Sequence, residues 1–328
     1  MNRIIAISPS PHVHTDDSVR KIMYRVILAL MPAFIWSVFI FGWDAVRVTL
    51  IAVLACMATE YLLQRYVLRI APTVTDGSAA LTGLLLAFNV PASLPWWIIV
   101  MGSFFAIAIA KTSFGGLGAN IFNPALAGRV FMLISFPVQM TSWPVGRGAA
   151  PDAVTAATPL GLLKEGIVSG QPLSQIQGSL PETMDLFLGT MGGSLGEISA
   201  LLLLAGGIYL LFRKIITWHI PVSILVAMFV YSGIFRLISP ENYMDPLFHI
   251  LAGGAILGAV YMATDMVTSP MNRKAQLIYG AGIGIITMTI RLFGAYPEGI
   301  SFAILIMNAF TPLLNTMIKP KRFGEKQP

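Results

Sequence analysis

Two threonine hydroxyls in a short polar segment are the groups in this sequence best suited to chemistry. Thr155 and Thr158 are separated by Ala156 and Ala157, and the carboxylate of Asp152 precedes Thr155 by three residues. Because small neighbours leave a hydroxyl open to a bulky partner, the segment could be a covalent attachment site. The same residue types favour turns and helix N-caps. From its residues alone, the segment is more typical of a turn or a helix start.

The segment 152–159, with the sequence D-A-V-T-A-A-T-P, resembles the signature D-x-x-[ST]-G-A-T. At that signature a flavin transferase esterifies FMN, through its phosphate, to the final threonine. The flanking run N-I-F-N-P-A-L-A-G-R at 120–129 carries the same resemblance. Over nearly its whole length the chain is similar to the D subunit of the Rnf ion-translocating ferredoxin:NAD oxidoreductase complex. It resembles the B subunit of the sodium-translocating NADH:quinone reductase more distantly.

The resemblance assigns roles to individual positions. It implies FMN on Thr158, with Thr155 as the first hydroxyl of the signature, Asp152 as its acidic residue and Ala157 directly before the acceptor. Ala156 stands where the signature has glycine, a change between small residues that keeps the acceptor. Family members also hold a non-covalent riboflavin in this subunit and assemble with iron-sulfur, flavin and other membrane subunits. The resemblance therefore implies an electron-relay subunit of an ion-translocating enzyme complex.

The composition is that of an integral membrane protein. Of the 328 residues, 56% are hydrophobic and 11% are charged, whereas soluble domains have about 25% charged residues. The mean hydropathy is +0.76. The net charge of +6 comes from short clusters at the ends of apolar runs. Basic clusters at the ends of apolar runs indicate how the chain is oriented in membrane lipid, and they argue against a nucleic-acid-binding patch.

The sequence lacks the ligand patterns of metal and dinucleotide sites. A single cysteine, Cys56, cannot hold an iron-sulfur cluster within this chain. No other His or Cys lies near His12 and His14 to complete a metal site, so we expect a solvated tail there. The G-G-L-G run at 115–118 has neither P-loop nor G-x-G-x-x-G spacing. We therefore expect no metal, no catalytic residue and no NAD site, with NAD and ferredoxin bound by partner chains.

Ten apolar runs predict an all-α membrane fold with broken helices. They lie at 22–41, 45–63, 79–90, 94–110, 119–138, 195–211, 216–237, 246–266, 277–292 and 300–318. The third, which N-V-P interrupts at 89–91, is too short to cross a bilayer alone. The predicted regions are a tail at 1–21, a five-helix repeat at 22–138, a flavin-bearing loop at 139–194, a second five-helix repeat at 195–318 and a tail at 319–328.

Basic residues cluster on one side of this ten-span topology. They precede span one and follow spans two, four, six, eight and ten. The clustered residues are Arg20, Lys21, Arg25, Arg65, Arg69, Lys111, Arg213, Lys214, Arg273, Lys274, Lys319, Lys321, Arg322 and Lys326. The positive-inside rule then puts both termini in the cytoplasm and the loop with Thr158 outside the cell inner membrane.

A repeated motif suggests two related halves. N-x-F-x-P-x-L at 120–126 recurs at 308–314, an offset of 188 residues. Five spans per half would invert the second copy, an arrangement found in transporters with binding sites at the midplane. The alternative function is therefore a channel or secondary transporter without redox chemistry. Such a protein would have the spans but no need of the threonine motif.

Polar side chains within apolar runs suggest function, because they are costly in a bilayer. Asn120 and Asn123 are three residues apart, so on a helix they would share a face beside Pro124. They could bind a flat polar ligand or join helices through amide hydrogen bonds, and the resemblance favours riboflavin. The acidic residues nearest the membrane interior, which could serve a cation route or act as caps and ion-pair partners, are Glu60, Asp76 and Asp265.

Overall fold

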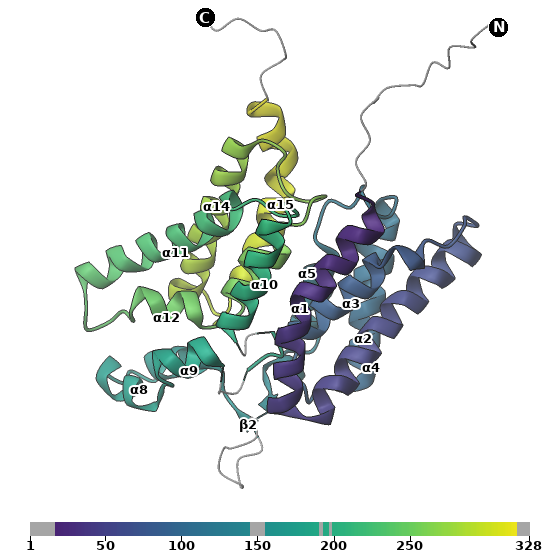
Figure 1. Cartoon of the computed structure of the whole chain (residues 1–328). Helices are drawn as coiled ribbons and strands as arrows, with labels where there is room; N and C mark the ends of the chain where they lie inside the picture. Colours follow the sequence, from purple (N-terminus) through teal and green to yellow (C-terminus); the bar gives the residue numbers. More distant parts are fainter. Residues whose placement is uncertain (1–16, 145–154, 190–192, 197–198, 320–328) are drawn as a thin grey trace, which may run out of the picture.

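The computed structural model describes residues 17–144, 155–189, 193–196 and 199–319. These residues are mostly helical, and in Figure 1 the helices of the two sequence halves form two neighbouring groups. The first group comprises α1 (Val19–Phe41), α2 (Trp43–Leu62), α3 (Ser78–Phe88), α4 (Trp96–Phe104) and α5 (Pro124–Ser135). Short π-helical or 3₁₀ turns follow α2 and α4, namely η1 (Leu63–Val67), η2 (Val74–Asp76), η3 (Phe105–Ile109) and η4 (Thr112–Phe114).

The second group contains two long paired helices and one broken helix. Its members are α10 (Ala200–Phe212), α11 (His219–Ile238), α12 (Pro246–Leu251), α13 (Ala255–Leu257), η5 (Gly258–Met262), α14 (Arg273–Phe293) and α15 (Ile300–Met317). The stretch from α12 to η5 is interrupted at Gly253, whose φ of +69° is a left-handed conformation that favours glycine. The predicted eighth run is therefore a discontinuous helix.

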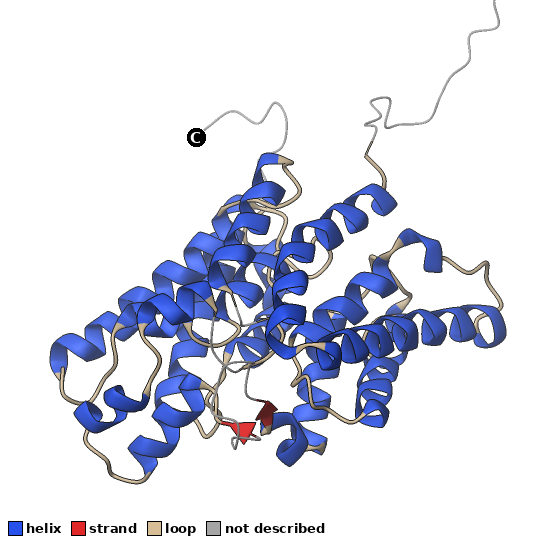
Figure 2. Ribbon diagram, turned by 60° about the horizontal axis from the view of Figure 1, so that its bottom comes forward, coloured by secondary structure: helices blue, strands red, loops and turns tan. Residues whose placement is uncertain are grey.

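Short elements connect the two groups. They are α6 (Pro137–Thr141), β1 (Trp143–Pro144), β2 (Thr155–Ala156), α7 (Pro159–Val168), α8 (Leu173–Ser179) and α9 (Thr183–Leu188). The two strands pair antiparallel, with Trp143 opposite Ala156. Figure 2 shows them in red beside the blue helices. Apart from this two-residue pairing, the described part of the chain is helical or loop, close to the all-α expectation.

Six of the ten predicted spans are confirmed in length, and the chain is a multi-pass membrane protein. The helices long and apolar enough to cross a membrane are α1, α2 with η1, α4 through η4, α11, α14 and α15. Three shorter apolar helices, α3, α5 and α10, occupy other predicted runs. With the broken α12–η5 segment, every predicted run contains helix, but a ten-helix topology is not confirmed.

Helix capping explains why α5 begins later than the fifth predicted run, which starts at residue 119. The side-chain oxygen of Asn123 accepts hydrogen bonds from two N–H groups of the first turn of α5, at 3.1 and 3.3 Å. Pro124 occupies the first helical position, where its missing N–H costs nothing. Residues 119–123 therefore lie outside the helix, which corrects the expected start of this span.

The two faces of the molecule carry different parts of the chain. In Figure 1, α1 begins and α15 ends at the top, whereas β2, α8 and α9 lie at the bottom. We call the side where α1 begins and α15 ends the terminal face, and the side with β2, α8 and α9 the loop face. The segment that leads from β2 to α7 thus lies on the face opposite the start of α1.

Close helix packing relies on glycine. A Cβ on Gly83 of α3 would come within 2.6 Å of the Val53 Cα in α2, and a Cβ on Gly284 of α14 within 2.7 Å of the Ile224 carbonyl oxygen in α11. Such small residues allow membrane helices to approach closely. In the first half α2 packs against α3 and α4, in the second α11 packs against α12 and α14, and α1 contacts α10 between the halves.

The repeated motif does not occupy equivalent places in the two halves. Asn120 precedes α5, whereas Asn308 lies within α15. The 188-residue offset is therefore not a structural offset, and the inverted repeat is not confirmed. The motif copies nevertheless meet, since the Asn308 amide, oriented to satisfy both of its groups, accepts a hydrogen bond from the Asn123 backbone N–H at 3.1 Å.

Candidate functional site

Thr158 is the N-cap of α7. Its φ and ψ of −63° and 157° are extended, and its Oγ accepts a hydrogen bond from the Gly161 N–H at 3.1 Å. Its carbonyl accepts the first helical hydrogen bond, from Leu162 N–H at 2.8 Å. Pro159 occupies the first helical position, so the sequence T-P specifies the helix start. The helix-start interpretation of this segment is thus confirmed as local geometry.

The N-terminus of α7 is also a suitable place for a phosphate group. Helix N-termini carry partial positive charge and unpaired N–H groups, so anions are stabilised there. A Cβ on Gly161 would lie 3.2 Å from the Thr158 Oγ, and glycine leaves that space open. Thr158 itself is 3% exposed, so its hydroxyl is buried at the start of α7.

The structure brings three of the four predicted motif residues together. Thr155 lies in β2, Ala157 and Thr158 follow that strand, and α7 begins at the next residue. Asp152 lies outside the described residues. The predicted role of Thr158 as a flavin acceptor stays a prediction, now with a defined position on the loop face.

A large cavity adjoins α7 at the loop face, and we call it the His249 cavity. Water molecules can be centred in about 940 Å³ of it, and its walls come from α7, α8, the loop before α12 and the end of α14. Lys164 of α7 donates to the Arg291 carbonyl at 3.3 Å, and burial lowers the pKa of the Lys164 ammonium. The guanidinium of Arg291 donates to the carbonyls of His249 and Ala252. No sequence pattern signals this cavity, because its walls are distant in the chain.

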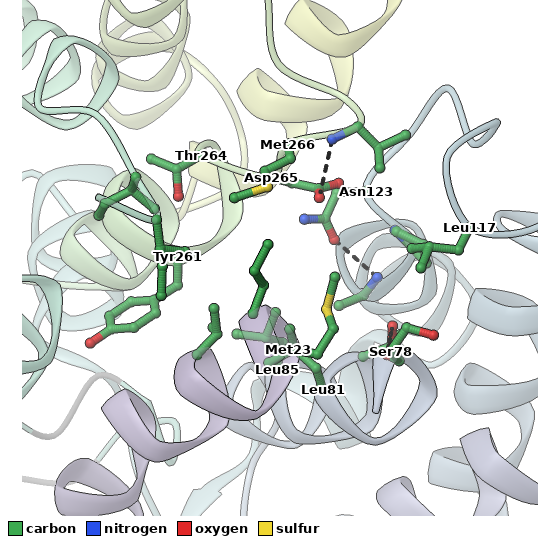
Figure 3. A pocket seen from close by; sticks show the side chains of 18 of the residues that line it. Met23, Ser78, Leu81, Leu85, Leu117, Asn123, Tyr261, Thr264, Asp265 and Met266 are labelled. Carbon is green, nitrogen blue, oxygen red and sulfur yellow. Dashed lines mark hydrogen bonds between the residues drawn. The ribbon is translucent and has the colours of Figure 1, made fainter. Parts of the chain in front are cut away.

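A second cavity opens among α1, α3, the loop before α5 and η5, and we call it the Asn120 cavity. Water molecules can be centred in about 110 Å³ of it. Figure 3 shows it enclosed by apolar side chains such as Leu81 and Leu85, with a few polar ones such as Ser78, Asn123 and Asp265. This mixture of apolar walls and few polar groups is typical of small-molecule sites.

Asn120 and Asn123 both line this cavity, but they do not share a helix face as predicted. Both polar atoms of the Asn123 amide have partners, because its oxygen caps α5 and its Nδ2 donates to the Met262 carbonyl at 3.1 Å. Asn120 precedes the helix and donates through Nδ2 to the Phe122 carbonyl at 3.2 Å. Its buried Oδ1 has no hydrogen-bond partner among the described residues. Asn120 thus offers a free acceptor, whereas Asn123 serves the fold.

The three acidic residues singled out from the sequence have different roles. Asp76 accepts the Ser78 N–H at 2.7 Å and so supports the start of α3. Asp265 lines the Asn120 cavity and accepts the Thr268 hydroxyl at 3.1 Å. Glu60 forms a buried ion pair with Lys111, 2.6 Å from Oε1 to Nζ.

The structure corrects the interpretation of Lys111 as a topology charge at the membrane surface. It is 1% exposed and lines the Asn120 cavity. A second buried ion pair that the sequence did not predict joins Arg129 of α5 to Glu298, before α15. Both pairs join partners at least 51 residues apart in the chain, so neither has a local sequence signal.

Comparisons with known proteins find relatives along nearly the whole chain. The model of the NQR2, RnfD, RnfE family matches residues 6–324. The chain is 47% identical to the D subunit of the proton-translocating ferredoxin:NAD(+) oxidoreductase complex of Clostridium ljungdahlii, over 99% of this chain and 97% of that protein. Identity and coverage are the same for the D subunit of the Na(+)-translocating complex of Acetobacterium woodii. The D subunit of the ion-translocating oxidoreductase complex of Stutzerimonas stutzeri is 41% identical, over 94% of this chain and 93% of that protein.

Proposed function

We propose that this chain, which belongs to the NQR2, RnfD, RnfE family, is the D subunit of an Rnf-type ion-translocating ferredoxin:NAD oxidoreductase complex. The observation that carries this proposal is the 47% identity, along 99% of the chain, to two such subunits. The role we assign to the chain is electron relay between a flavin on Thr158 and a flavin in the Asn120 cavity. Those subunits belong to oxidoreductases, which argues against a channel without redox chemistry.

The first flavin is FMN, esterified through its phosphate to the Oγ of Thr158. Bound flavin supplies the redox chemistry, and the chain supplies attachment and position. The N-cap position supports this assignment, because a phosphoester at the start of α7 lies at the positive end of the helix dipole. Gly161 supports it too, since it leaves the space beside the hydroxyl open. Asp152, Thr155 and Ala157 complete the motif that the transferase recognises.

The second flavin is riboflavin, held without a covalent bond in the Asn120 cavity. The residues fit a flat ring with polar edges, because apolar side chains form most of the wall and the Asn120 Oδ1 can accept a hydrogen bond. Asn123 contributes by fixing the start of α5 beside the ring. The start of α1 lines the Asn120 cavity, whereas Thr158 follows β2 on the opposite face, an arrangement that supports a relay across the membrane.

Partner subunits handle the remaining substrates and cofactors. In this assignment NAD, ferredoxin and the iron-sulfur clusters are bound by other chains of the complex. The present chain associates with those chains in the lipid bilayer. The two relatives of equal identity are named for different ions, proton and Na⁺. Overall similarity therefore does not select the ion.

The orientation that we assign places the terminal face in the cytoplasm and the loop face outside the cell inner membrane. The basic clusters described above support this orientation through the positive-inside rule. We also retain two inverted five-helix repeats as the architecture. The corresponding packing of α2 on α3 and α4, and of α11 on α12 and α14, supports this pairing.

Mass spectrometry of the peptide containing Thr158 tests the proposal. The chain is produced together with its flavin transferase, and we expect the mass of an FMN phosphoester on this peptide. The Thr158→Ala variant should lose the modification, and the Thr155→Ala variant, as a matched control, should keep its acceptor. An unmodified wild-type peptide under these conditions would refute the covalent flavin.

A further inference from the structure

A buried lysine is the cationic side chain in the wall of the Asn120 cavity among the described residues. Lys111 follows η3 and is 1% exposed. Its Nζ donates to the Glu60 Oε1 at 2.6 Å and to the Ser78 Oγ at 2.7 Å. An ammonium has three N–H donors, so two are engaged and the third has no hydrogen-bond partner among the described residues. Glu60 does not line the cavity, and the cationic partner of the pair is thus the one nearer the ligand space.

Several side chains hold this lysine in place from two helices. Ser78 accepts from Lys111 and donates in turn to Asp76 Oδ1 at 2.6 Å. On the α2 side, the Gln64 amide lies 3.5 Å from Glu60 Oε1 and also donates to Thr73 at 2.8 Å. Glu60 opposes the field of this charge, but a charge fixed in an apolar wall acts on a neighbouring ligand more strongly than the same charge in water, because the dielectric there is low and no reorganisation is needed.

We propose that Lys111 sets the redox potential of the ligand in the Asn120 cavity, and that Glu60 is its positioning residue. This inference rests on the proposed function, in which the cavity holds a flavin. Two electrons and one proton, received from the relay, convert the oxidised ring to a reduced ring with one net negative charge. A nearby ammonium favours the form with more negative charge and therefore raises the potential. Charge beside the ring is one of the means by which a protein tunes a flavin.

The test measures the midpoint potential of the non-covalent flavin in the purified, full-length chain. Lys111→Met should lower the potential, and a tenfold loss of preference for the reduced ring corresponds to about 30 mV for a two-electron couple. Glu60→Gln removes the counter-charge and keeps a hydrogen-bond partner, so it should raise the potential. A purely structural role of the pair would shift both variants in the same direction or release the flavin from both.

The double variant Glu60→Gln/Lys111→Met guards against misfolding, because replacing a buried pair together avoids an unpaired charge. Its potential should also fall below that of the wild type. The matched control is Arg129→Met/Glu298→Gln, which removes another buried pair that lines neither cavity. The control should leave the potential unchanged, and the FMN on Thr158 gives an internal reference.

Each outcome decides a separate statement. If the wild type holds flavin but the Lys111 variants keep its potential, or if Lys111→Met and Glu60→Gln shift it in the same direction, this inference is wrong and the relay proposal stands. If the wild-type chain, made with riboflavin supplied, holds no extractable flavin, both the flavin assignment of this cavity and the inference fall.

Discussion

Replacing Asn120 and Asn123 one at a time should separate ligand binding from folding. The two asparagines look alike in the sequence but have different hydrogen bonds in the structure. Asn123→Ala removes a helix cap, which costs about 0.5–2 kcal/mol. It also removes the hydrogen bond from Nδ2 to the Met262 carbonyl, which keeps the Asp265 N–H as a donor at 3.5 Å, at a cost of about 0.5–1.5 kcal/mol. We therefore expect Asn123→Ala to lower the free energy of unfolding by about 1–3.5 kcal/mol.

Compared with Asn123→Ala, the Asn120→Ala variant should lose less stability and more flavin binding. Within the chain it removes one hydrogen bond, from Nδ2 to the Phe122 carbonyl, worth about 0.5–1.5 kcal/mol. The Oδ1 that it also removes has no partner among the described residues and belongs to a side chain in the cavity wall. A ligand that used this acceptor would lose about 1–3 kcal/mol of binding, which is roughly tenfold to a hundredfold in affinity.

Two measurements on each variant are sufficient. Thermal unfolding in one detergent reports stability, and acid precipitation separates the extractable flavin from the covalent flavin, which stays with the pellet. The Asn120 variant should unfold near the wild-type temperature and lose extractable flavin, and the double variant should lose it too. The assignment is refuted if Asn120→Ala folds, keeps its covalent FMN and releases as much riboflavin as the wild type.

Three more experiments address the attachment site, the orientation and the second ion pair. Gly161→Val should reduce esterification at the neighbouring N-cap severalfold by crowding the hydroxyl, and the FMN content of the peptide by mass spectrometry checks this. Reporter fusions at position 160 should be extracytoplasmic and those at 214 cytoplasmic, and a cytoplasmic 160 would overturn the orientation. Arg129→Met should destabilise the chain by about 3–5 kcal/mol through an unpaired buried charge, whereas adding Glu298→Gln should recover most of the unfolding temperature in the same thermal assay.

Features encoded locally could be predicted from the sequence. Each apolar run contains helix because the bilayer leaves no other way to satisfy its backbone, and the short third run is the eleven-residue α3. The T-P and N-P pairs both start helices, α7 and α5, as capping residues followed by proline should. What failed at Asn120 and Asn123 was the assumption that a run of apolar residues is helical throughout.

Features made by distant residues could not be predicted. The walls of both cavities come from segments of both halves or from loops joined only in three dimensions. The repeated motif did not predict equivalent positions for a related reason, because four matching letters at a fixed offset do not require the same place in a helix. Asn308 lies within α15, where it contacts the Tyr279 hydroxyl at 2.6 Å.

Lys111 shows how one residue can satisfy a sequence rule and serve another purpose. It follows an apolar run at the terminal face, as a topology charge does, but it is paired inside the protein with Glu60. A charge neutralised by a buried carboxylate contributes little to the positive-inside balance. The orientation argument survives without it, because spans two, six, eight and ten are still followed by Arg65, Arg213, Arg273 and Lys319, respectively. Because membrane topology does not require Lys111, its charge is better explained by the cavity that it lines.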